Sequence, residues 1–327
     1  MQQLHQLTHA FLPSVRVLAA STAVLAILSH TAPEAAAMPG GPNEYELEIL
    51  DIPPGPFPPF GLAPLALDMN NRGQVVGQGG GLFGVNNFDA FLYEDGQITE
   101  VQFPGAFATD ASGINDQGGI FGSYAFGNPA MGAPTFGYYL DATGNFIDIN
   151  PPGAVSTRVF GGNNRGDAVG IFFDGMLPFP QSFMRSKQGV YTTITPPADS
   201  LILIAIGIND HGVISGESID FTFTTHDFLL EDGVFTTIDV PFDDVCSTGG
   251  AGRTNNRGDL TGSYALCPET GGIGLGYVRT RGGVFQDVSF PVPSTFTQMS
   301  AISDRGDLLG VAFFADGSTQ CFVWHRD

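Results

Sequence analysis

The stretch Gly113-Ile-Asn-Asp-Gln-Gly-Gly-Ile-Phe-Gly-Ser-Tyr124 contains a tight turn, with glycines three and seven residues after Asn115. Asn and Asp tolerate turn conformations and Gly supplies a positive φ without a Cβ clash, so the pattern predicts a β-hairpin. The same spacing occurs at six places, after an Asn or a Ser each time, which indicates a repeat of about 46 residues. The first glycines of the six turns are Gly73, Gly118, Gly166, Gly212, Gly258 and Gly306.

A second hairpin follows the first one in each repeat. Its incoming strand carries one aromatic residue, and its outgoing strand ends at a proline, which cannot donate a hydrogen bond to a neighbouring strand. Four short strands per repeat are typical of one blade of a β-propeller. The aromatic column consists of Phe91, Tyr138, Phe183, Phe228, Tyr277 and Phe322.

The fourth strand of the last repeat is missing from the C-terminus, because the chain ends after its third strand. A matching segment, Glu46-Leu-Glu-Ile-Leu-Asp-Ile-Pro53, stands at the other end and aligns with Val234-Phe-Thr-Thr-Ile-Asp-Val-Pro241. In a closed ring, such a displaced strand completes the last repeat, so that no strand edge is left unpaired. We therefore predict an all-β, six-bladed β-propeller of four-stranded blades over residues 45–327, closed by the N-terminal strand pairing into the last blade. A β-solenoid or a two-domain β-sandwich is the alternative.

Several of these columns resemble the bacterial extracellular repeat of the HAF family, which is named for a His-Ala-Phe tripeptide in the third strand. The nearest forms of that tripeptide here are Asp89-Ala90-Phe91 and His226-Asp227-Phe228. The resemblance covers nearly all of residues 45–327. It implies export and a repeat fold, and it brings no catalytic residues.

The N-terminal segment has the features of a signal peptide. Arg16 precedes an apolar stretch, Val17–Leu28, that is too short to span a bilayer, and Ala35-Ala36-Ala37 fits a cleavage site before Met38. We predict a signal peptide over residues 1–37 and a short linker over residues 38–44. The mature chain is then expected to be secreted or periplasmic, with no membrane span.

The net charge limits the kinds of partner that the chain is expected to bind, and the composition fits the predicted fold. The chain carries 33 Asp and Glu against 12 Lys and Arg, a formal net charge of −21, which repels a phosphate backbone and predicts no nucleic-acid partner. It contains 45 Gly and 23 Pro but remains 43% hydrophobic, as expected of an all-β protein with many turns and a buried core. We expect a monomer.

Three cysteines remain after the predicted cleavage. If Asn255 faces Gly258 in the first hairpin of the fifth repeat, Cys246 and Cys267 stand opposite each other across that hairpin. An exported protein lies in the compartment where disulfides persist, so we predict that the two are bonded. Two buried thiols are the alternative. Cys321 has no evident partner and is expected in the core.

The connections opposite the tight turns are longer and differ in sequence between repeats. Binding residues are often found on such loops of a rigid scaffold, so we place a candidate ligand site there, around the mouth of the central channel. The candidates are Asp110, Arg158, Asp243 and Asp244.

The sequence contains no known catalytic, metal-binding or phosphate-binding motif, so we expect no catalytic residues, no metal and no cofactor. The functional hypothesis is a non-enzymatic binding scaffold that recognises a glycan, a peptide or a surface protein through its variable loop face. The alternative is a carbohydrate-active hydrolase or lyase with carboxylates at the central channel, since glycosidases use such acid pairs.

Overall fold

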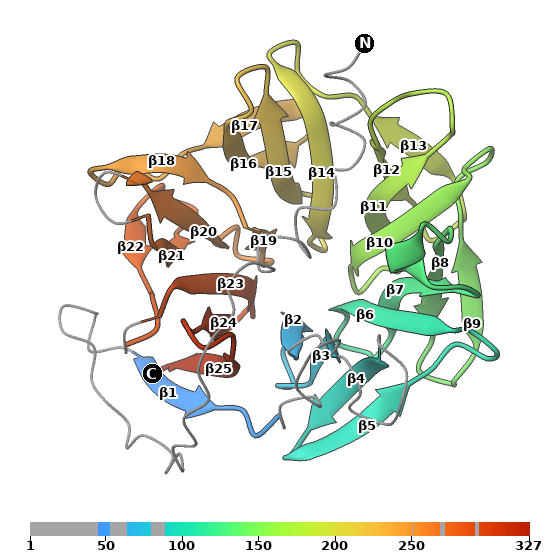
Figure 1. Cartoon of the computed structure of the whole chain (residues 1–327), viewed down its shortest axis with the longest axis horizontal. Coiled ribbons are helices and arrows are strands. Elements are labelled where there is room, and N and C mark those ends of the chain that lie inside the picture. Colours follow the sequence, from blue (N-terminus) through green and yellow to red (C-terminus); the bar gives the residue numbers. More distant parts are fainter. Residues whose placement is uncertain (1–44, 53–63, 80–88, 251, 269–271, 292–293) are drawn as a thin grey trace. The chain divides into compact units, whose positions relative to one another are not determined.

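The computed structural model describes residues 45–52, 64–79, 89–250, 252–268, 272–291 and 294–327 (Figure 1). The predicted signal peptide and linker lie outside these residues. The described part is all-β, as predicted, with strands, turns and one short 3-10 helix, Pro129–Met131. Within it, no helix is long and apolar enough to cross a membrane.

Four sheets each consist of four antiparallel strands, and strands adjacent in sequence are adjacent in the sheet. The first sheet contains β2 (Leu65–Met69), β3 (Val75–Gly79), β4 (Asp89–Glu94) and β5 (Gln97–Val101). The second contains β6 (Ala108–Ile114), β7 (Ile120–Ala125), β8 (Phe136–Leu140) and β9 (Phe146–Ile149). The third contains β10 (Ser156–Gly162), β11 (Ala168–Phe173), β12 (Gln181–Arg185) and β13 (Tyr191–Ile194). The fourth contains β14 (Ser200–Ile208), β15 (Ile214–Asp220), β16 (Thr225–Glu231) and β17 (Val234–Ile238).

The remaining strands form one nine-stranded sheet, which covers the fifth and sixth repeats. A single parallel pair, Gly274 with Phe296, joins the two repeats. The fifth repeat supplies β18 (Val245–Thr248), β19 (Arg253–Thr254), β20 (Leu260–Leu266), β21 (Gly274–Arg279) and β22 (Phe285–Asp287). The sixth repeat supplies β23 (Phe296–Ile302), β24 (Leu308–Phe313) and β25 (Thr319–Arg326), and β1 (Tyr45–Ile49) lies beside β25.

The N-terminal strand β1 pairs antiparallel with β25, the last strand of the chain. The register runs from Tyr45 opposite Arg326 to Ile49 opposite Phe322. The next residue, Leu50, is buried, and its N–H donates to the carbonyl of Cys321 at 3.0 Å. The segment predicted to be the displaced fourth strand is thus hydrogen-bonded along the third strand of the last repeat.

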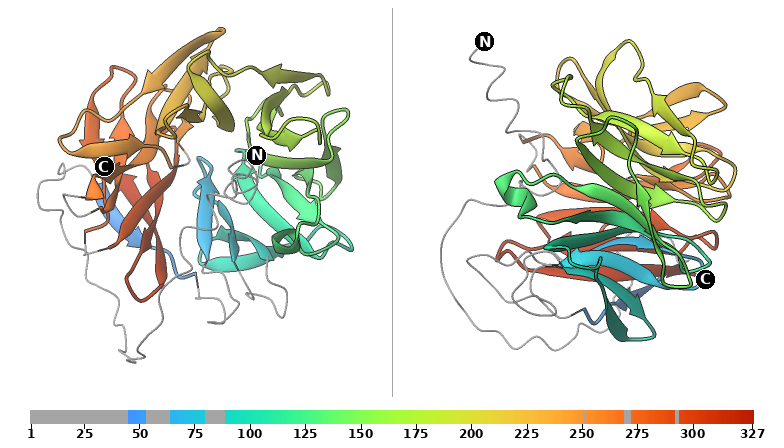
Figure 2. Two further views of the ribbon diagram at one scale, coloured as in Figure 1. Left: turned by 45° about the horizontal axis from the view of Figure 1, so that its top comes forward. Right: turned by 90° about the vertical axis from the view of Figure 1, so that its right-hand side faces the viewer.

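The first strand of each repeat faces a common centre (Figures 1 and 2). In the fifth repeat this strand is divided into β18 and β19, which both pair with β20, and β19 is the inner part. These inner strands are β2, β6, β10, β14, β19 and β23; each contacts the next, and β23 contacts β2. Both hairpin turns of a repeat lie at the same end of its sheet, because Asp167 in one turn accepts a hydrogen bond from the N–H of Lys187 in the other, at 3.0 Å. We call this end the turn face. The opposite end, which holds the connections between second and third strands and between repeats, is the loop face.

The predicted aromatic column is buried throughout the six repeats. Each ring lies directly across from the second glycine of its own repeat, as Phe91 does from Gly77 and Phe322 from Gly310. A Cβ at Gly77 would approach Phe91 Cζ to 2.7 Å, and one at Gly310 would approach Phe322 Cζ to 2.4 Å. Gly77 and Gly310 therefore make room for a ring that packs on the backbone, a role that the turn pattern alone did not indicate.

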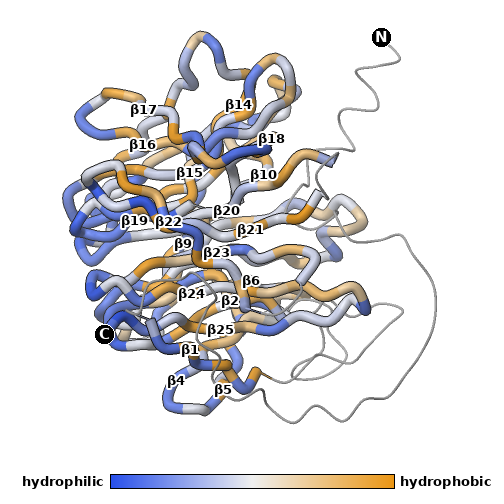
Figure 3. The backbone as a smooth tube through the Cα atoms, turned by 90° about the vertical axis from the view of Figure 1, so that its left-hand side faces the viewer, coloured by the Kyte–Doolittle hydropathy of each residue, from blue (hydrophilic) through white to orange (hydrophobic). Residues whose placement is uncertain are grey.

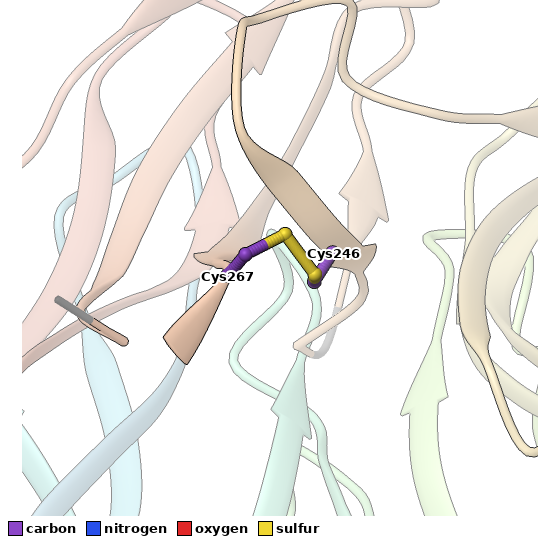
Figure 4. Close-up of a disulfide and its surroundings, with 2 residues drawn as sticks. All are labelled: Cys246 and Cys267. Atoms are coloured by element: carbon purple, nitrogen blue, oxygen red, sulfur yellow. A yellow bond between two sulfur atoms is a disulfide. The ribbon is translucent and has the colours of Figure 1, made fainter. Parts of the chain in front are cut away.

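Cys246 on β18 and Cys267, directly after β20, form a disulfide with their Cα atoms 4.9 Å apart (Figure 4). The predicted pairing is confirmed, but the constant register behind it is wrong. Val245 pairs with Leu266 and Ser247 with Ala265, so the register shifts at Cys246. Cys321 is a free thiol in the core, and burial raises its pKa to about 12.

Candidate functional site

Two of the four predicted site residues lie in one small pocket. Asp110 on β6 and Arg158 on β10 belong to the inner strands of neighbouring sheets, and both are half-buried. The pocket has a volume of about 30 Å³ and is also lined by Ser123, Tyr124 and Thr135. Its lining therefore combines a carboxylate, a guanidinium, hydroxyls and an aromatic ring, which are groups that orient polar ligands.

The Asp110 carboxylate is held in place by its own sheet. One of its oxygens accepts hydrogen bonds from the Ser112 hydroxyl at 3.0 Å and from the Ser123 N–H at 2.9 Å. Burial raises the pKa of Asp110 and outweighs the opposing attraction of Arg158 and these two bonds. The Arg158 guanidinium attracts this carboxylate across the pocket.

An aromatic cluster borders the same pocket. Tyr124 stacks on Phe103 with ring centroids 3.6 Å apart, and the exposed Phe126 meets Tyr124 edge-on. The Tyr124 hydroxyl donates to Asp148 at 3.0 Å, and burial together with that carboxylate raises the pKa of Tyr124 to about 12. The hydroxyl therefore stays protonated and fixes the ring beside the pocket.

The other two predicted residues lie elsewhere on the loop face. Asp243 and Asp244 are exposed in the turn between β17 and β18 and do not line the pocket. Asp244 has a positive φ of 61°, and its carbonyl accepts a hydrogen bond from the N–H of Cys267 at 2.8 Å. The structure thus divides the four predicted residues into a half-buried pair and an exposed pair.

Exposed apolar side chains gather on the loop face. Of the thirteen large apolar residues that are exposed among those described, nine lie on its connections, whereas the edge with the first turns is mainly hydrophilic (Figure 3). Because exposed apolar groups that gather on one surface are associated with binding, this asymmetry marks the loop face. The nine are Phe107, Phe126, Met131, Val155, Met176, Leu177, Phe221, Phe223 and Ile273.

The second residue of each first turn alternates between Asn and Asp, and these six residues form a ring of hydrogen bonds on the turn face. Each backbone N–H donates to the side chain of the next member at 2.6–2.8 Å. Each Asn amide donates to both neighbouring carboxylates at 2.7–2.9 Å. The members, in order, are Asn71, Asp116, Asn164, Asp210, Asn256 and Asp304, which is bonded to Asn71 again.

Arg253 on β19 fills the space between the inner strands beneath this ring. Its guanidinium lies 3.6 Å from the carboxylate of Asp68 on β2. It also donates to three backbone carbonyls on β6, β10 and β14, each at a residue where the strand bulges. These are Ser112 at 2.5 Å, Phe160 at 2.8 Å and Ile206 at 3.2 Å. One side chain therefore links four inner strands, and a cavity of about 90 Å³ remains between it and the ring.

Sequence reasoning missed both the ring of Asn and Asp side chains and Arg253, although Arg253 left a signal in the alignment of the repeats. The residues that match Arg253 in four other repeats are Gly113, Gly161, Gly207 and Ala301, so a charged side chain stands out in this column. A Cβ at Gly161 would lie 2.7 Å from the Arg253 guanidinium, which explains the small residues. Asp68, in the first repeat, is the other charged exception and the ion-pair partner.

The three histidines among the described residues lie apart from one another. His226 on β16 stands between two carboxylates on the loop face, 2.6 Å from Asp239 and 3.6 Å from Asp220. Burial lowers the pKa of His226, but the two carboxylates outweigh it and raise that pKa. His211 lies in a first turn, and His325 pairs with Glu48. Within the described residues, no group of three His, Cys, Asp or Glu side chains is arranged to hold a metal ion.

One carboxylate is buried without a cationic partner. Asp227 on β16 has no exposed surface; one oxygen accepts a hydrogen bond from the Tyr277 hydroxyl at 2.5 Å, and the other has no partner among the described residues. Burial, together with the nearby Glu217 and Asp239, raises its pKa well above the usual 3.8. The folded state therefore holds a proton on Asp227 at pH values where the unfolded chain has lost it.

We expect Asp227→Asn to stabilise the protein near neutral pH. A raised folded-state pKa makes stability fall as pH rises from about 3.8 to that pKa, and the amide removes this loss. The expected gain at pH 7.5 is roughly 1–3 kcal/mol, the scale of a buried polar group left unsatisfied. Urea unfolding at pH 4 and pH 7.5 measures it, with the exposed Asp232→Asn as the control. Equal pH dependence in Asp227→Asn and the wild type would contradict this assignment.

Comparison with solved structures finds propeller-like all-β proteins. A triple arginine-to-alanine mutant of AofleA from Arthrobotrys oligospora matches with a TM-score of 0.50 at 12% identity, over 86% of this chain and 88% of that one. A streptogramin B lyase structure matches with a TM-score of 0.46 at 13% identity, over 87% and 98%. A mutant Aleuria aurantia lectin in complex with Fucalpha1-6GlcNAc matches with a TM-score of 0.49 at 10% identity, over 84% and 96%. No family model and no curated protein matches the chain. At such identities the likeness concerns the fold alone.

Proposed function

We propose that the mature chain is an exported, non-enzymatic binding scaffold that recognises an extracellular ligand through its loop face. The gathering of exposed apolar side chains on that face carries the proposal, since a folded protein in water gains nothing from exposing them together. The turn face, by contrast, satisfies its polar groups within its own ring of Asn and Asp side chains. The ligand is a glycan, a peptide or another surface protein.

We infer that the scaffold is a six-bladed propeller closed by β1. The hydrogen-bonded ring that returns from Asp304 to Asn71 supports six blades, as does the single parallel pair that joins the fifth and sixth repeats. The pairing of β1 with β25 supports closure by the N-terminal strand. Blades held in this way form a rigid base for the loops.

Export and membership of the HAF-type repeats belong to the same proposal. The residues 89–91 and 226–228, with the repeated Asn and Gly columns, support the family resemblance. The disulfide between Cys246 and Cys267 supports an oxidising compartment, where such bonds persist.

Binding to arrays of glycans and peptides by residues 38–327 tests the proposal. We expect a ligand whose binding is lost in Met176→Ser/Leu177→Ser, two exposed loop-face residues. The matched control is Val190→Ser/Val234→Ser, two exposed apolar residues at the second turns, and it should bind as the wild type does. Absence of any binding, or equal loss in both variants, would contradict the scaffold.

The alternative, a carbohydrate-active hydrolase or lyase with carboxylates at the central channel, has less support. Acid–base cleavage of a glycoside needs two carboxyl groups that flank the substrate. Asp68 lies beside Arg253 beneath the ring, and Asp110 lies in its own pocket with Arg158. Turnover of a polysaccharide in the same screen would favour this alternative.

A further inference from the structure

The positive charges of the described chain are segregated onto the turn face. The first turns hold Arg72, Arg165, Arg257 and Arg305, and five further Lys or Arg residues lie at the turn-face ends of β12, β21 and β25 or in the turns that follow them. Arg253 is buried at the centre. Arg158 is therefore the one Lys or Arg that the described residues place on the loop face, and it lies beside Asp110.

Carboxylates remain on the loop face without matching cations. Asp199, Asp243 and Asp244 are exposed in connections between repeats. Asp220 and Asp239 stand on either side of His226, the other basic group there. With a formal net charge of −21 behind it, this face attracts cations and repels anions, including anionic lipid surfaces and nucleic acids.

Two aromatic rings project from the same region. Phe221 and Phe223 are 63% and 57% exposed at the tip of the connection between β15 and β16. The Asp220 carboxylate holds this tip by accepting hydrogen bonds from the N–H groups of Thr222 at 2.7 Å and Thr224 at 2.9 Å. The hydroxyl of Thr222, together with these N–H groups, lowers the pKa of Asp220 to about 2, so this carboxylate stays ionised at physiological pH.

We infer that the loop face docks a cationic polypeptide segment that also carries apolar side chains. Its apolar groups would pack on Phe221 and Phe223, and its Lys or Arg residues would face Asp243 and Asp244. The inference rests on the proposed binding function and adds the chemistry of the partner. Among the described residues of this face, Arg158 is the one Lys or Arg, and the resulting excess of carboxylates favours a positive partner, because complementary charge steers and orients association.

A short peptide of alternating lysine and phenylalanine tests the inference, with glutamate–phenylalanine and lysine–serine peptides as comparisons. Binding to residues 38–327 is measured by fluorescence anisotropy at low salt. We expect the lysine–phenylalanine peptide to bind best, and its Kd to rise about fivefold in Asp243→Asn/Asp244→Asn. Because about 0.5 M salt screens exposed pairs, the Kd of the wild type should rise with salt, and the Kd of Asp243→Asn/Asp244→Asn should rise less.

The control variants test whether binding depends on where the removed carboxylates lie or only on how many are removed. Asp95→Asn/Asp232→Asn removes two exposed carboxylates from second turns, and Asp95, Asp232 and Asp244 share a positive φ that Asn tolerates. This pair should leave the Kd unchanged, whereas Phe221→Ser/Phe223→Asn should weaken binding. Equal effects of the two Asp pairs, or equal binding of the glutamate peptide, would overturn the inference. Loss of glycan or neutral-peptide binding in Met176→Ser/Leu177→Ser would then still support the scaffold, so the two failures are distinguishable.

Discussion

Deletion of residues 44–53 is expected to lower the melting temperature of the protein made as residues 38–327 by about 10–20 °C. The deletion removes β1, whose residues pair with β25 from Tyr45 to Ile49, and it exposes the side of β25 that this strand covers. Leu50 is 3% exposed, and Leu47 and Ile49 pack against the core that contains Trp324. Burying apolar groups of this size contributes about 5 kcal/mol in total.

Differential scanning calorimetry measures the effect. The control is a truncation that removes the N-terminal residues up to residue 43 and leaves β1 in place. A synthetic peptide of residues 44–53, added to the deleted protein, should restore part of the stability by pairing with the exposed edge. If the deleted protein melts like the intact one, β1 does not close the last repeat. An ordinary terminus would tolerate such trimming.

Replacement of Arg253 by Ala is expected to cost about 3–5 kcal/mol, the scale of removing one partner from a buried ion pair. The change leaves the Asp68 carboxylate buried without its cation, and it removes the donors from three carbonyls. Urea unfolding measures the loss. Arg257→Ala removes an arginine that pairs with Asp259 at the surface, and it should cost less than about 1 kcal/mol.

The cost of Arg253→Ala should also grow with pH. Burial raises the pKa of Asp68, and Arg253 and the backbone N–H groups of Ile114 and Met69 oppose that rise. Without the guanidinium the folded-state pKa rises further, so stability is kept at low pH and lost as pH rises toward that pKa. Asp68→Asn in the Arg253→Ala background should remove this dependence. Equal losses in Arg253→Ala and Arg257→Ala would show that the central arginine is dispensable.

Much of the fold can be predicted from the sequence because the residues that determine it act within their own turn or strand. A turn that needs a positive φ, a proline that ends a strand and an aromatic residue in the third strand each recur at a fixed spacing, as Gly73, Pro104 and Phe91 show in the first repeat. The register around Cys246 was not predictable in this way. A bulge there depends on how the strand packs against its neighbours, and no single residue encodes it.

The candidate site was predictable only in part. Asp110 and Arg158 occupy the same position on neighbouring inner strands, so the repeat alignment brings them together. The ring of Asn and Asp side chains was missed because each turn was interpreted singly. Asn71 and Asp116 are suitable turn residues in isolation, and their bond appears only when two repeats are placed side by side.

The alternation of amide and carboxylate around the turns imposes a rule of parity. Each amide needs an acid on both sides, and each acid needs an amide, so the pattern joins up only around an even number of repeats. Inserting or losing one repeat would bring two like members together, and two adjacent carboxylates would repel each other with no donor between them. Evolutionary growth or shrinkage of such a ring by whole repeats is therefore expected to proceed in pairs, unless a turn residue changes at the same step.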